Sequence, residues 1–274
     1  MRRKIISDSH YNDNAKLYLG RLSTVINRKY SFDPNKVGNL IHKEYKTPYG
    51  ITMMAGYPLF RSPKMNNNYT QIIKRLSKIT PNQLFYPIDK THISLNVTIR
   101  IDHKIKHNSH IPSDNSELFY KDYINIIKNI TFSSFSLKAC HILPHGIILW
   151  KPNHNPEELF NIRKQIVEML VNASCLSPNF DNIEGQPIIP DIIHTTFMRP
   201  FDIKEFKTNY QAYFSELEKI NTEIKNGALF NEPLEIDEIA LFDDCINSSV
   251  NVTSPNDFFN KFSTKSFGIR QNAR

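Results

Sequence analysis

Two matching tetrapeptides constrain this chain more than any other feature of its sequence. Residues 92–95 read His-Ile-Ser-Leu and residues 194–197 read His-Thr-Thr-Phe, so both follow the pattern His-x-(Ser/Thr)-apolar. Each lies in a stretch typical of a strand, over residues 91–101 and 188–199. Because side chains two apart on a strand point to the same face, each motif presents an imidazole beside a hydroxyl. Two such pairs facing each other would surround a small anion with acid/base groups and hydroxyl donors.

The two motifs occupy equivalent places in a weak internal repeat. In the first half, a predicted strand over residues 50–57 precedes a helix with apolar positions at helical spacing over residues 69–79. In the second half, a predicted strand over residues 146–151 precedes a similar helix over residues 159–170. A histidine strand follows each helix. The order strand, helix, histidine strand therefore occurs twice, although little residue identity accompanies it.

Capping and helix-breaking residues predict where these helices begin and end. Residues 61–68 are predicted to form turns before the first helix, and Pro81 ends that helix. Asn155 and Pro156 are predicted as the N-cap and first position of the second helix. A further helix is expected to begin at Asp202, where the pattern Asp-x-x-Glu is typical of a capping box.

The remaining elements indicate an α+β protein with three parts. A helix is predicted over residues 116–130, and strands are predicted over residues 135–140 and 235–242. Residues 1–47 are polar and are interpreted as an N-terminal extension, partly helical near residues 15–28. A globular body is expected over residues 48–253, followed by a C-terminal tail over residues 254–274 in which phenylalanines dock.

Composition narrows the classes of function without choosing among them. The chain has 274 residues, 40% hydrophobic and 22% charged, which is ordinary for a globular protein. Its formal net charge of +7 favours an anionic partner. The eight glycines form neither GxGxxG nor GxxxxGK[ST], which disfavours a phosphate-binding glycine loop. Three scattered cysteines and the lack of a usual signal or membrane span lead us to expect a cytoplasmic location.

At these residues the chain resembles the 2H phosphoesterase superfamily, which includes the LigT-like RNA phosphodiesterases. The resemblance covers about residues 48–253: two His-x-(Ser/Thr)-x motifs, and in the second half a strand pair, an amphipathic helix and a proline-flanked histidine strand. It implies two pseudo-symmetric lobes, each a small antiparallel sheet with helices outside, facing a central cleft. One departure is Ser94, where threonine is more usual; its hydroxyl keeps the same donor capacity.

The motif residues suit metal-independent hydrolysis of a phosphodiester. His92 and His194 can serve as general base and general acid, one each, because a free imidazole titrates near ~6.5. The sequence leaves open which takes which role. Ser94 and Thr196 would donate hydrogen bonds to the non-bridging oxygens, where charge gathers in the transition state. The resemblance implies a 2′,3′-cyclic phosphate, a 2′,5′-linkage or a cyclic oligonucleotide as substrate, with no cofactor.

Four further residues are candidate substrate contacts. Lys90 shares the strand face of His92, while Arg199 lies an odd number of residues past His194 and needs a bulge to reach the same face. Tyr86 or Phe197 could stack on a base. Surface charge or core packing is the competing interpretation for all four.

Two rival functions remain open. The first is a catalytically weak module that binds RNA or a nucleotide on the same fold. The second is a metal-dependent hydrolase that uses His103, His107 and His110, although no acidic or cysteine ligand accompanies them and a solvated loop is the simpler interpretation. The expected partner is a nucleotide or short RNA, with no membrane contact. Nothing in the sequence sets the oligomeric state, and a monomer is compatible with it.

Overall fold

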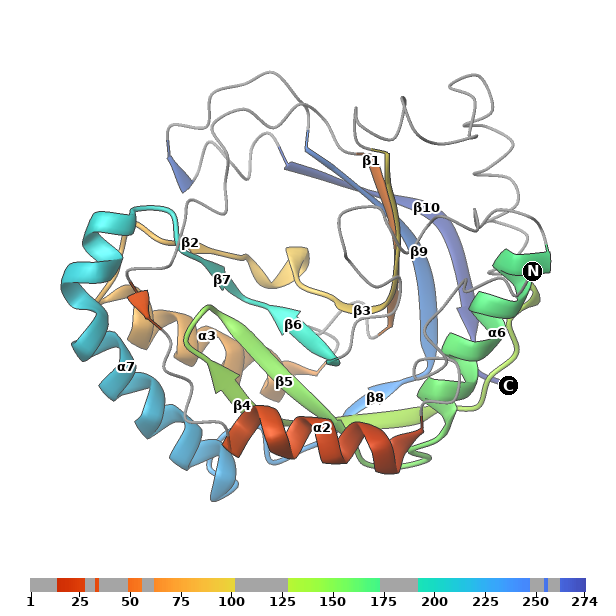
Figure 1. Ribbon diagram of the computed structural model, residues 1–274, viewed down its shortest axis with the longest axis horizontal. Coiled ribbons are helices and arrows are strands. Elements are labelled where there is room, and N and C mark those ends of the chain that lie inside the picture. The colour runs from red at the N-terminus through yellow and green to blue at the C-terminus, as the bar shows by residue number, and fades with distance from the viewer. Residues whose placement is uncertain are drawn as a thin grey trace, which may run out of the picture.

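The described residues form two four-stranded antiparallel sheets and a two-stranded sheet, with helices packed around them (Figure 1). The computed structural model describes residues 14–27, 33–34, 49–55, 62–101, 128–172, 192–246, 254–255 and 262–274. Of residues 49–55, 90, 94–101, 167, 169–172, 240–246 and 262–272 it describes only the backbone. The α+β class with two antiparallel sheets, as predicted, is confirmed. Among the helices described, none is long and apolar enough to cross a lipid bilayer.

The first sheet has the order β10-β9-β1-β3 and contains the first motif. Its strands are β1 (Tyr49–Ala55), β3 (Ile93–Ile101), β9 (Glu238–Ile246) and β10 (Phe262–Asn272). Strand β10 lies in the segment predicted as a C-terminal tail, so most of that segment belongs to the sheet. Its sequence mixes polar residues with few apolar ones, and pairing with β9 rather than an apolar pattern defines it as a strand.

The second sheet has the order β6-β5-β4-β8 and contains the second motif. Its strands are β4 (Phe135–Leu143), β5 (Ile147–Pro152), β6 (His194–Thr196) and β8 (Leu234–Ile236). Within the predicted strand over residues 188–199, residues 188–191 lie outside the described residues, residues 192–193 are not in a strand, and Phe197 separates β6 from a second short strand. Most of the predicted helix over residues 116–130 also lies outside the described residues.

The two sheets repeat one topology, which accounts for the repeat in the sequence. Helix α3 (Pro63–Ser77) connects β1 to β3, and helix α6 (Glu158–Asn172) precedes β6 in the same way after β5. In both halves the histidine strand is the edge strand and pairs antiparallel with the strand that precedes the helix. The predicted order strand, helix, histidine strand is therefore present twice in the described structure.

Both helices of the repeat begin at places other than those predicted. Helix α3 starts at Pro63, because the Ser62 side chain accepts a hydrogen bond from the Met65 amide at 3.3 Å and proline suits the first turn. The predicted turns therefore end at Ser62. Helix α6 starts at Glu158, and Asn155 does not cap it. Asn155 has φ 48°, and its side-chain Nδ2 donates to the Ser134 carbonyl.

A short strand pair joins the two halves. Strand β2 (Leu84–Phe85) of the first half pairs with β7 (Met198–Arg199) of the second. The buried Gln83 secures this junction, because its side chain accepts from the Phe201 amide at 2.8 Å and donates to Glu205 at 2.7 Å. The sequence indicated Glu205 as part of a capping box, yet its carboxylate binds the neighbouring segment. Only the other half of that box forms, from the Glu205 amide to Asp202.

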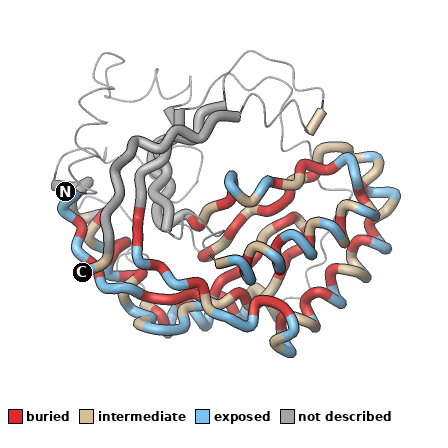
Figure 2. Tube along the Cα trace, turned by 180° about the vertical axis from the view of Figure 1, so that it is seen from behind, coloured by how far each residue is buried: buried red, intermediate tan, exposed pale blue. Residues whose placement is uncertain are grey.

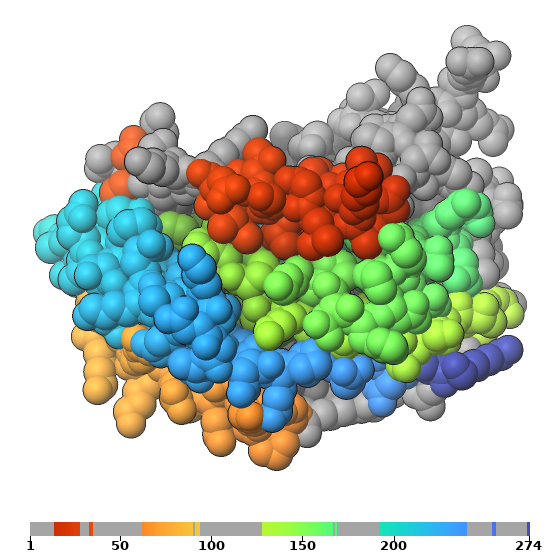
Figure 3. All heavy atoms as spheres, turned by 90° about the horizontal axis from the view of Figure 1, so that it is seen from below, coloured from red at the N-terminus to blue at the C-terminus, as the bar shows by residue number. Residues whose placement is uncertain are grey.

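Two helices outside the repeat hold the second sheet. Helix α7 (Ile203–Lys225) lies along β4, where Asn221 accepts from the Ile142 amide at 2.7 Å and donates to its carbonyl at 3.1 Å. One side chain thus satisfies both backbone groups of a strand edge. Helix α2 (Ala15–Asn27) comes from the predicted extension and lies at the surface beside α6 (Figure 3). Its Tyr18 is fully buried, so α2 contributes to the core.

Among the side chains that the structure describes, buried apolar residues gather between the second sheet and its helices (Figure 2). The largest fully buried side chains among them are Trp150, Tyr18, Tyr213, Phe135, Phe197, Phe206 and Phe230. The predicted division into an extension ending at residue 47, a body and a tail remains a prediction about domain boundaries.

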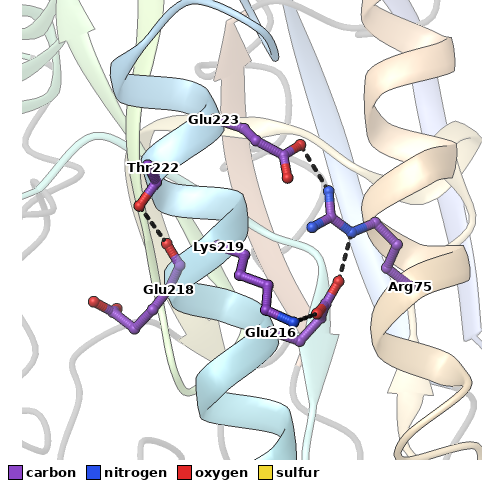
Figure 4. Close-up of polar contacts among 6 residues, drawn as sticks. All are labelled: Arg75, Glu216, Glu218, Lys219, Thr222 and Glu223. Carbon is purple, nitrogen blue, oxygen red and sulfur yellow. Dashed lines mark hydrogen bonds and ion pairs between the residues drawn. The ribbon is translucent and has the colours of Figure 1, made fainter.

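An arginine connects helices α3 and α7 at the surface (Figure 4). The Arg75 Nε lies 2.7 Å from Glu216 Oε1, and its Nη1 lies 2.7 Å from Glu223 Oε2. Hydrogen bonding by Arg75 lowers the pKa of Glu216 below its ordinary 4.5. A carboxylate whose folded-state pKa is lowered stabilises the protein above the unfolded-state pKa and loses this effect as pH falls.

We therefore expect Arg75→Gln to lower the free energy of unfolding at pH 7 by roughly 1 kcal/mol. The difference from wild type should shrink as pH falls below about 4.5, where Glu216 takes up a proton. Urea unfolding at several pH values measures both effects. Lys64→Gln is the matched control, because Lys64 and Glu232 form an ion pair that is about half exposed on both sides. An equal loss in both variants would contradict a special contribution from Arg75.

Candidate active site

The two edge strands that carry the motifs contact each other, and this contact brings their histidines together. His92 directly precedes β3, His194 is the first residue of β6, and both side chains are half-buried. The charge of His92 lowers the pKa of His194, so the two imidazoles are within electrostatic range. The fold thus places His92 and His194 within electrostatic range, and their action as a catalytic pair stays a prediction.

The orientation of His194 is fixed through one ring nitrogen. Its Nδ1 lies 2.9 Å from the Ile192 carbonyl oxygen, which can only accept a hydrogen bond. Nδ1 consequently carries the proton in the neutral ring, and Nε2 keeps its lone pair. The Ile192 carbonyl thus selects a tautomer in which Nε2 can accept a proton.

Burial lowers the pKa of His194 below its ordinary 6.5, and the positive charges of His92, Arg163 and Arg199 lower it further. The hydrogen bond to the Ile192 carbonyl acts in the opposite direction but is the smaller effect. At neutral pH the ring is therefore mostly uncharged, which is the state that a general base requires.

Thr196 shares the strand face of His194. His194 and Thr196 are half-buried, whereas Thr195 between them is fully buried and its hydroxyl accepts from Trp150 Nε1 at 2.9 Å. This alternation is the one that the motif predicted. On the other strand, the backbone of Ser94 lies in β3 opposite Met54, and its side chain is outside the described part of the chain. The role of Ser94 as a donor remains a prediction.

A bulge brings Arg199 to the face of His194. The amides of Phe197 and Met198 both donate to the Gly146 carbonyl, at 2.8 and 3.2 Å, and both side chains are fully buried. Two consecutive residues therefore point inward, which shifts the alternation by one position. Arg199 is half-buried, and its charge reaches His194. The odd spacing in the sequence does not separate these two residues.

The structure does not place the other three predicted substrate contacts at an open surface of the site. Phe197 is 0% exposed and Tyr86 is 6% exposed, so both rings belong to the core and present no open face for stacking on a base. The Tyr86 amide donates to the Phe197 carbonyl at 2.8 Å, which joins the two halves near the site. Of Lys90 only the backbone is described, at the end of the short 3-10 helix Ile88–Lys90.

Sequence reasoning missed His145 as a site residue. It lies in the β4–β5 turn beside Gly146, whose carbonyl holds the bulge next to Thr196, and its side chain is half-buried. Burial lowers the pKa of His145, and the charge of His194 lowers it further. The sequence offered only a Pro-His-Gly turn between two apolar stretches as a signal, and this pattern does not indicate that the turn lies beside the second motif.

Arg163 is a second residue that the sequence did not single out. It lies on α6 and is 2% exposed, within electrostatic range of His194 and Tyr18. Its spacing offered a signal, because Leu159, Ile162 and Ile166 place position 163 on the inward face of the helix. A buried arginine next to His194 makes this end of the site electropositive.

The site as described gathers imidazoles and guanidinium groups and therefore suits an anion. In the described part of the chain, no group of three or more His, Cys, Asp or Glu side chains could hold a metal ion. His103, His107 and His110 lie outside the described residues. His141 is half-buried in β4, where burial lowers its pKa and Glu218 raises it.

Comparison with known proteins finds similar folds and no similar sequence. No protein-family model and no curated protein matches the chain. E. coli LigT complexed with 3′-AMP is similar, with TM-score 0.41 and 12% identity, over 82% of this chain and 98% of LigT. A conserved protein of unknown function from Agrobacterium tumefaciens has TM-score 0.44 and 14% identity, over 77% of this chain and 87% of that chain. TT0787 of Thermus thermophilus has TM-score 0.42 and 12% identity, over 82% of this chain and 98% of that chain.

These likenesses span most of the chain, with TM-scores of 0.41 to 0.44 and identities of 12% to 14%. At this level of identity they say nothing of the reaction or of individual residues. The chemistry is accordingly argued from the chain's own side chains.

The electrostatics of His194 can be measured directly. Histidine NMR should find a His194 pKa below 6.5 and a neutral ring protonated at Nδ1. Arg199→Gln should raise this pKa, because it removes a positive charge that disfavours the imidazolium. Arg75→Gln, which removes a guanidinium bound to α7, should leave it unchanged. A His194 pKa above 6.5, or one equally insensitive to both variants, would contradict the described geometry.

Proposed function

We propose that this protein is a phosphodiesterase that hydrolyses a nucleotide or RNA phosphodiester by two-histidine acid/base catalysis. The observation that carries the proposal is the meeting of His92 and His194 at the contact of two edge strands, with His194 held neutral. Cyclic phosphodiester hydrolysis needs one base and one acid at a single anionic centre. The surrounding arginines match the charge of such a substrate.

The tautomer of His194 suggests how the roles divide. His194 Nε2 accepts a proton from water as the water oxygen attacks phosphorus, and His92 in its protonated form donates to the departing ribose oxygen. One P–O bond forms and one breaks, and the product is a phosphomonoester. The two histidines have then exchanged charge states, and solvent restores them before the next turnover.

Three groups are proposed to stabilise the charge that develops on the phosphoryl oxygens. Thr196 lies on the face of His194 and can donate its hydroxyl proton, and Ser94 is assigned the same role in the other half. Arg199 provides a guanidinium on the same face, which can bind two oxygens at once. Such preorganised donors supply the charge stabilisation that a metal ion supplies in other phosphodiesterases.

The substrates proposed are a 2′,3′-cyclic phosphate, a 2′,5′-linkage or a cyclic oligonucleotide, as the family resemblance implies. The alternative is a catalytically weak module that binds RNA or a nucleotide at the same place. A panel of these compounds separates the two proposals, because a binding module would retain a ligand without converting it. The neutral state of His194 favours turnover, since binding of an anion alone would be better served by a charged ring.

We expect His92→Ala and His194→Ala each to lower kcat by at least ~10²-fold, the usual scale of general acid–base catalysis. The double variant should be little worse than either single one, because the two residues act as a unit. Steady-state kinetics on the best compound of the panel measures both effects. His154→Ala is the matched control, since His154 is exposed in the loop before α6. Near-normal turnover in either single variant would refute the assignment.

Hydrolysis should persist in excess EDTA, because hydroxyl, imidazole and guanidinium groups make the transition-state contacts. The assay compares initial rates before and after chelation, with a metal-dependent phosphodiesterase in the same buffer to show that chelation is complete. Activity that EDTA abolishes and a divalent ion restores would overturn metal independence. That outcome would direct attention to His103, His107 and His110.

A further inference from the structure

Tyr18 of helix α2 reaches the strand pair that carries His194. Its hydroxyl donates to the Trp150 carbonyl at 2.6 Å and accepts from the Ile193 amide at 3.2 Å. The side chain is 0% exposed. The residue therefore connects the N-terminal segment to the backbone immediately before the second motif.

The hydroxyl stands where a regular ladder would have a direct hydrogen bond. Along β5 and β6, Ile148 lies opposite Thr195, and the next hydrogen-bonded pair in this register is Trp150 with Ile193. One bond of that pair is direct, from the Trp150 amide to the Ile193 carbonyl at 3.0 Å. The other runs through Tyr18, from the Ile193 amide to the hydroxyl and on to the Trp150 carbonyl. The Tyr18 hydroxyl therefore takes the place of a direct bond from the Ile193 amide to the Trp150 carbonyl.

The Tyr18 hydroxyl helps to position the backbone of residues 192–193, which precede His194. The carbonyl of Ile192, the residue before Ile193, lies 2.9 Å from His194 Nδ1 and accepts its hydrogen bond. Moving Ile193 toward Trp150 would move that carbonyl and turn the imidazole. Thr195 is fixed separately, because its hydroxyl accepts from Trp150 Nε1 at 2.9 Å. The backbone on the N-terminal side of His194 is thus held by two hydrogen bonds, a direct one from the Trp150 amide to the Ile193 carbonyl and one from the Ile193 amide to Tyr18.

Helix α2 is itself anchored well enough to act in this way. The Ala15 amide donates to Glu157 Oε2 at 3.2 Å, which ties the start of α2 to the start of α6. The Tyr18 ring packs on Phe160 with centroids 5.9 Å apart, and the Arg21 guanidinium lies 5.9 Å from the Tyr18 centroid. Burial raises the pKa of Tyr18 well above its ordinary value, so the hydroxyl keeps its proton throughout the working pH range.

We propose that Tyr18 is a positioning residue for His194. Its hydroxyl fixes residues 192–193 so that the Ile192 carbonyl holds the Nδ1 proton and Nε2 faces the reacting centre. The consequence for rate rests on the proposed function, whereas the consequence for the His194 ring does not. Helix α2 then serves the reaction without contact with the substrate.

The test compares Tyr18→Phe with Tyr213→Phe. Both replace a fully buried tyrosine and keep the ring, but the Tyr213 hydroxyl makes no hydrogen bond with the described part of the chain. In Tyr18→Phe, kcat should fall at least about tenfold with KM within about twofold, because misplacement of a catalytic group mainly affects the chemical step. Tyr213→Phe should change neither value.

Histidine NMR provides a measurement that is independent of turnover. Weakening the hydrogen bond to Ile192 removes an effect that raises the His194 pKa, so Tyr18→Phe should lower this pKa and move the acid limb of kcat/KM to lower pH. The neutral tautomer should become mixed. Tyr213→Phe should retain the wild-type pKa and tautomer.

The outcomes separate the two proposals. A His194 signal in Tyr18→Phe identical to that in Tyr213→Phe overturns the positioning role, whether or not the wild type hydrolyses a phosphodiester. A shifted signal in a protein that hydrolyses none of the panel supports positioning and refutes the proposed function. If Tyr18→Phe does not fold, 3-fluorotyrosine at position 18 keeps the ring and weakens the hydroxyl as an acceptor. An unshifted His194 pKa in that protein overturns the proposal.

Discussion

The close approach of the Gly146 turn to residues 197 and 198 determines the geometry of the candidate site. Gly146 has φ 84°, and a Cβ at this position would lie 2.2 Å from the Met198 carbonyl oxygen. Glycine is therefore required on two independent grounds, backbone conformation and space. Its carbonyl accepts two consecutive amides, and the resulting bulge places Arg199 on the face of His194. The same turn carries His145, so one glycine brings two charged or titratable groups to the second motif.

The sequence was sufficient for the parts of the site that depend on periodicity. Alternation along a strand placed His194 and Thr196 together, and the repeated element order placed the two histidine strands at equivalent positions of the two sheets. Alternation failed beyond Phe197, because a bulge arises from a contact with a turn some 50 residues earlier in the chain. It failed likewise for β10, whose pairing partner rather than its own pattern makes it a strand. Contacts between distant segments, such as Tyr18 with Trp150, leave no local trace in the sequence.

The site combines a neutral His194 with positively charged neighbours, and those neighbours are part of the reason that the ring is neutral. Burial and nearby arginines disfavour the charged form of His194, which keeps it ready to accept a proton. An anionic substrate would partly cancel those arginine charges and thereby raise the pKa of the ring on binding. His194 would then be a stronger base in the substrate complex than in the free enzyme. In the free enzyme its low pKa keeps the ring neutral, and in the complex its higher pKa favours proton transfer from water.

The two halves share a topology, and His194 in the second half has a support that lies outside the repeat. His194 has a fixed tautomer, because Ile192 accepts its Nδ1 proton and Tyr18 fixes the neighbouring backbone. That support comes from α2, which lies outside the repeated strand–helix–strand units. A symmetric pair of histidines could exchange the roles of acid and base according to the pose of the substrate. In the proposed mechanism, the helix added on one side breaks that equivalence, because it supports the tautomer of His194 in which Nε2 can act as the base.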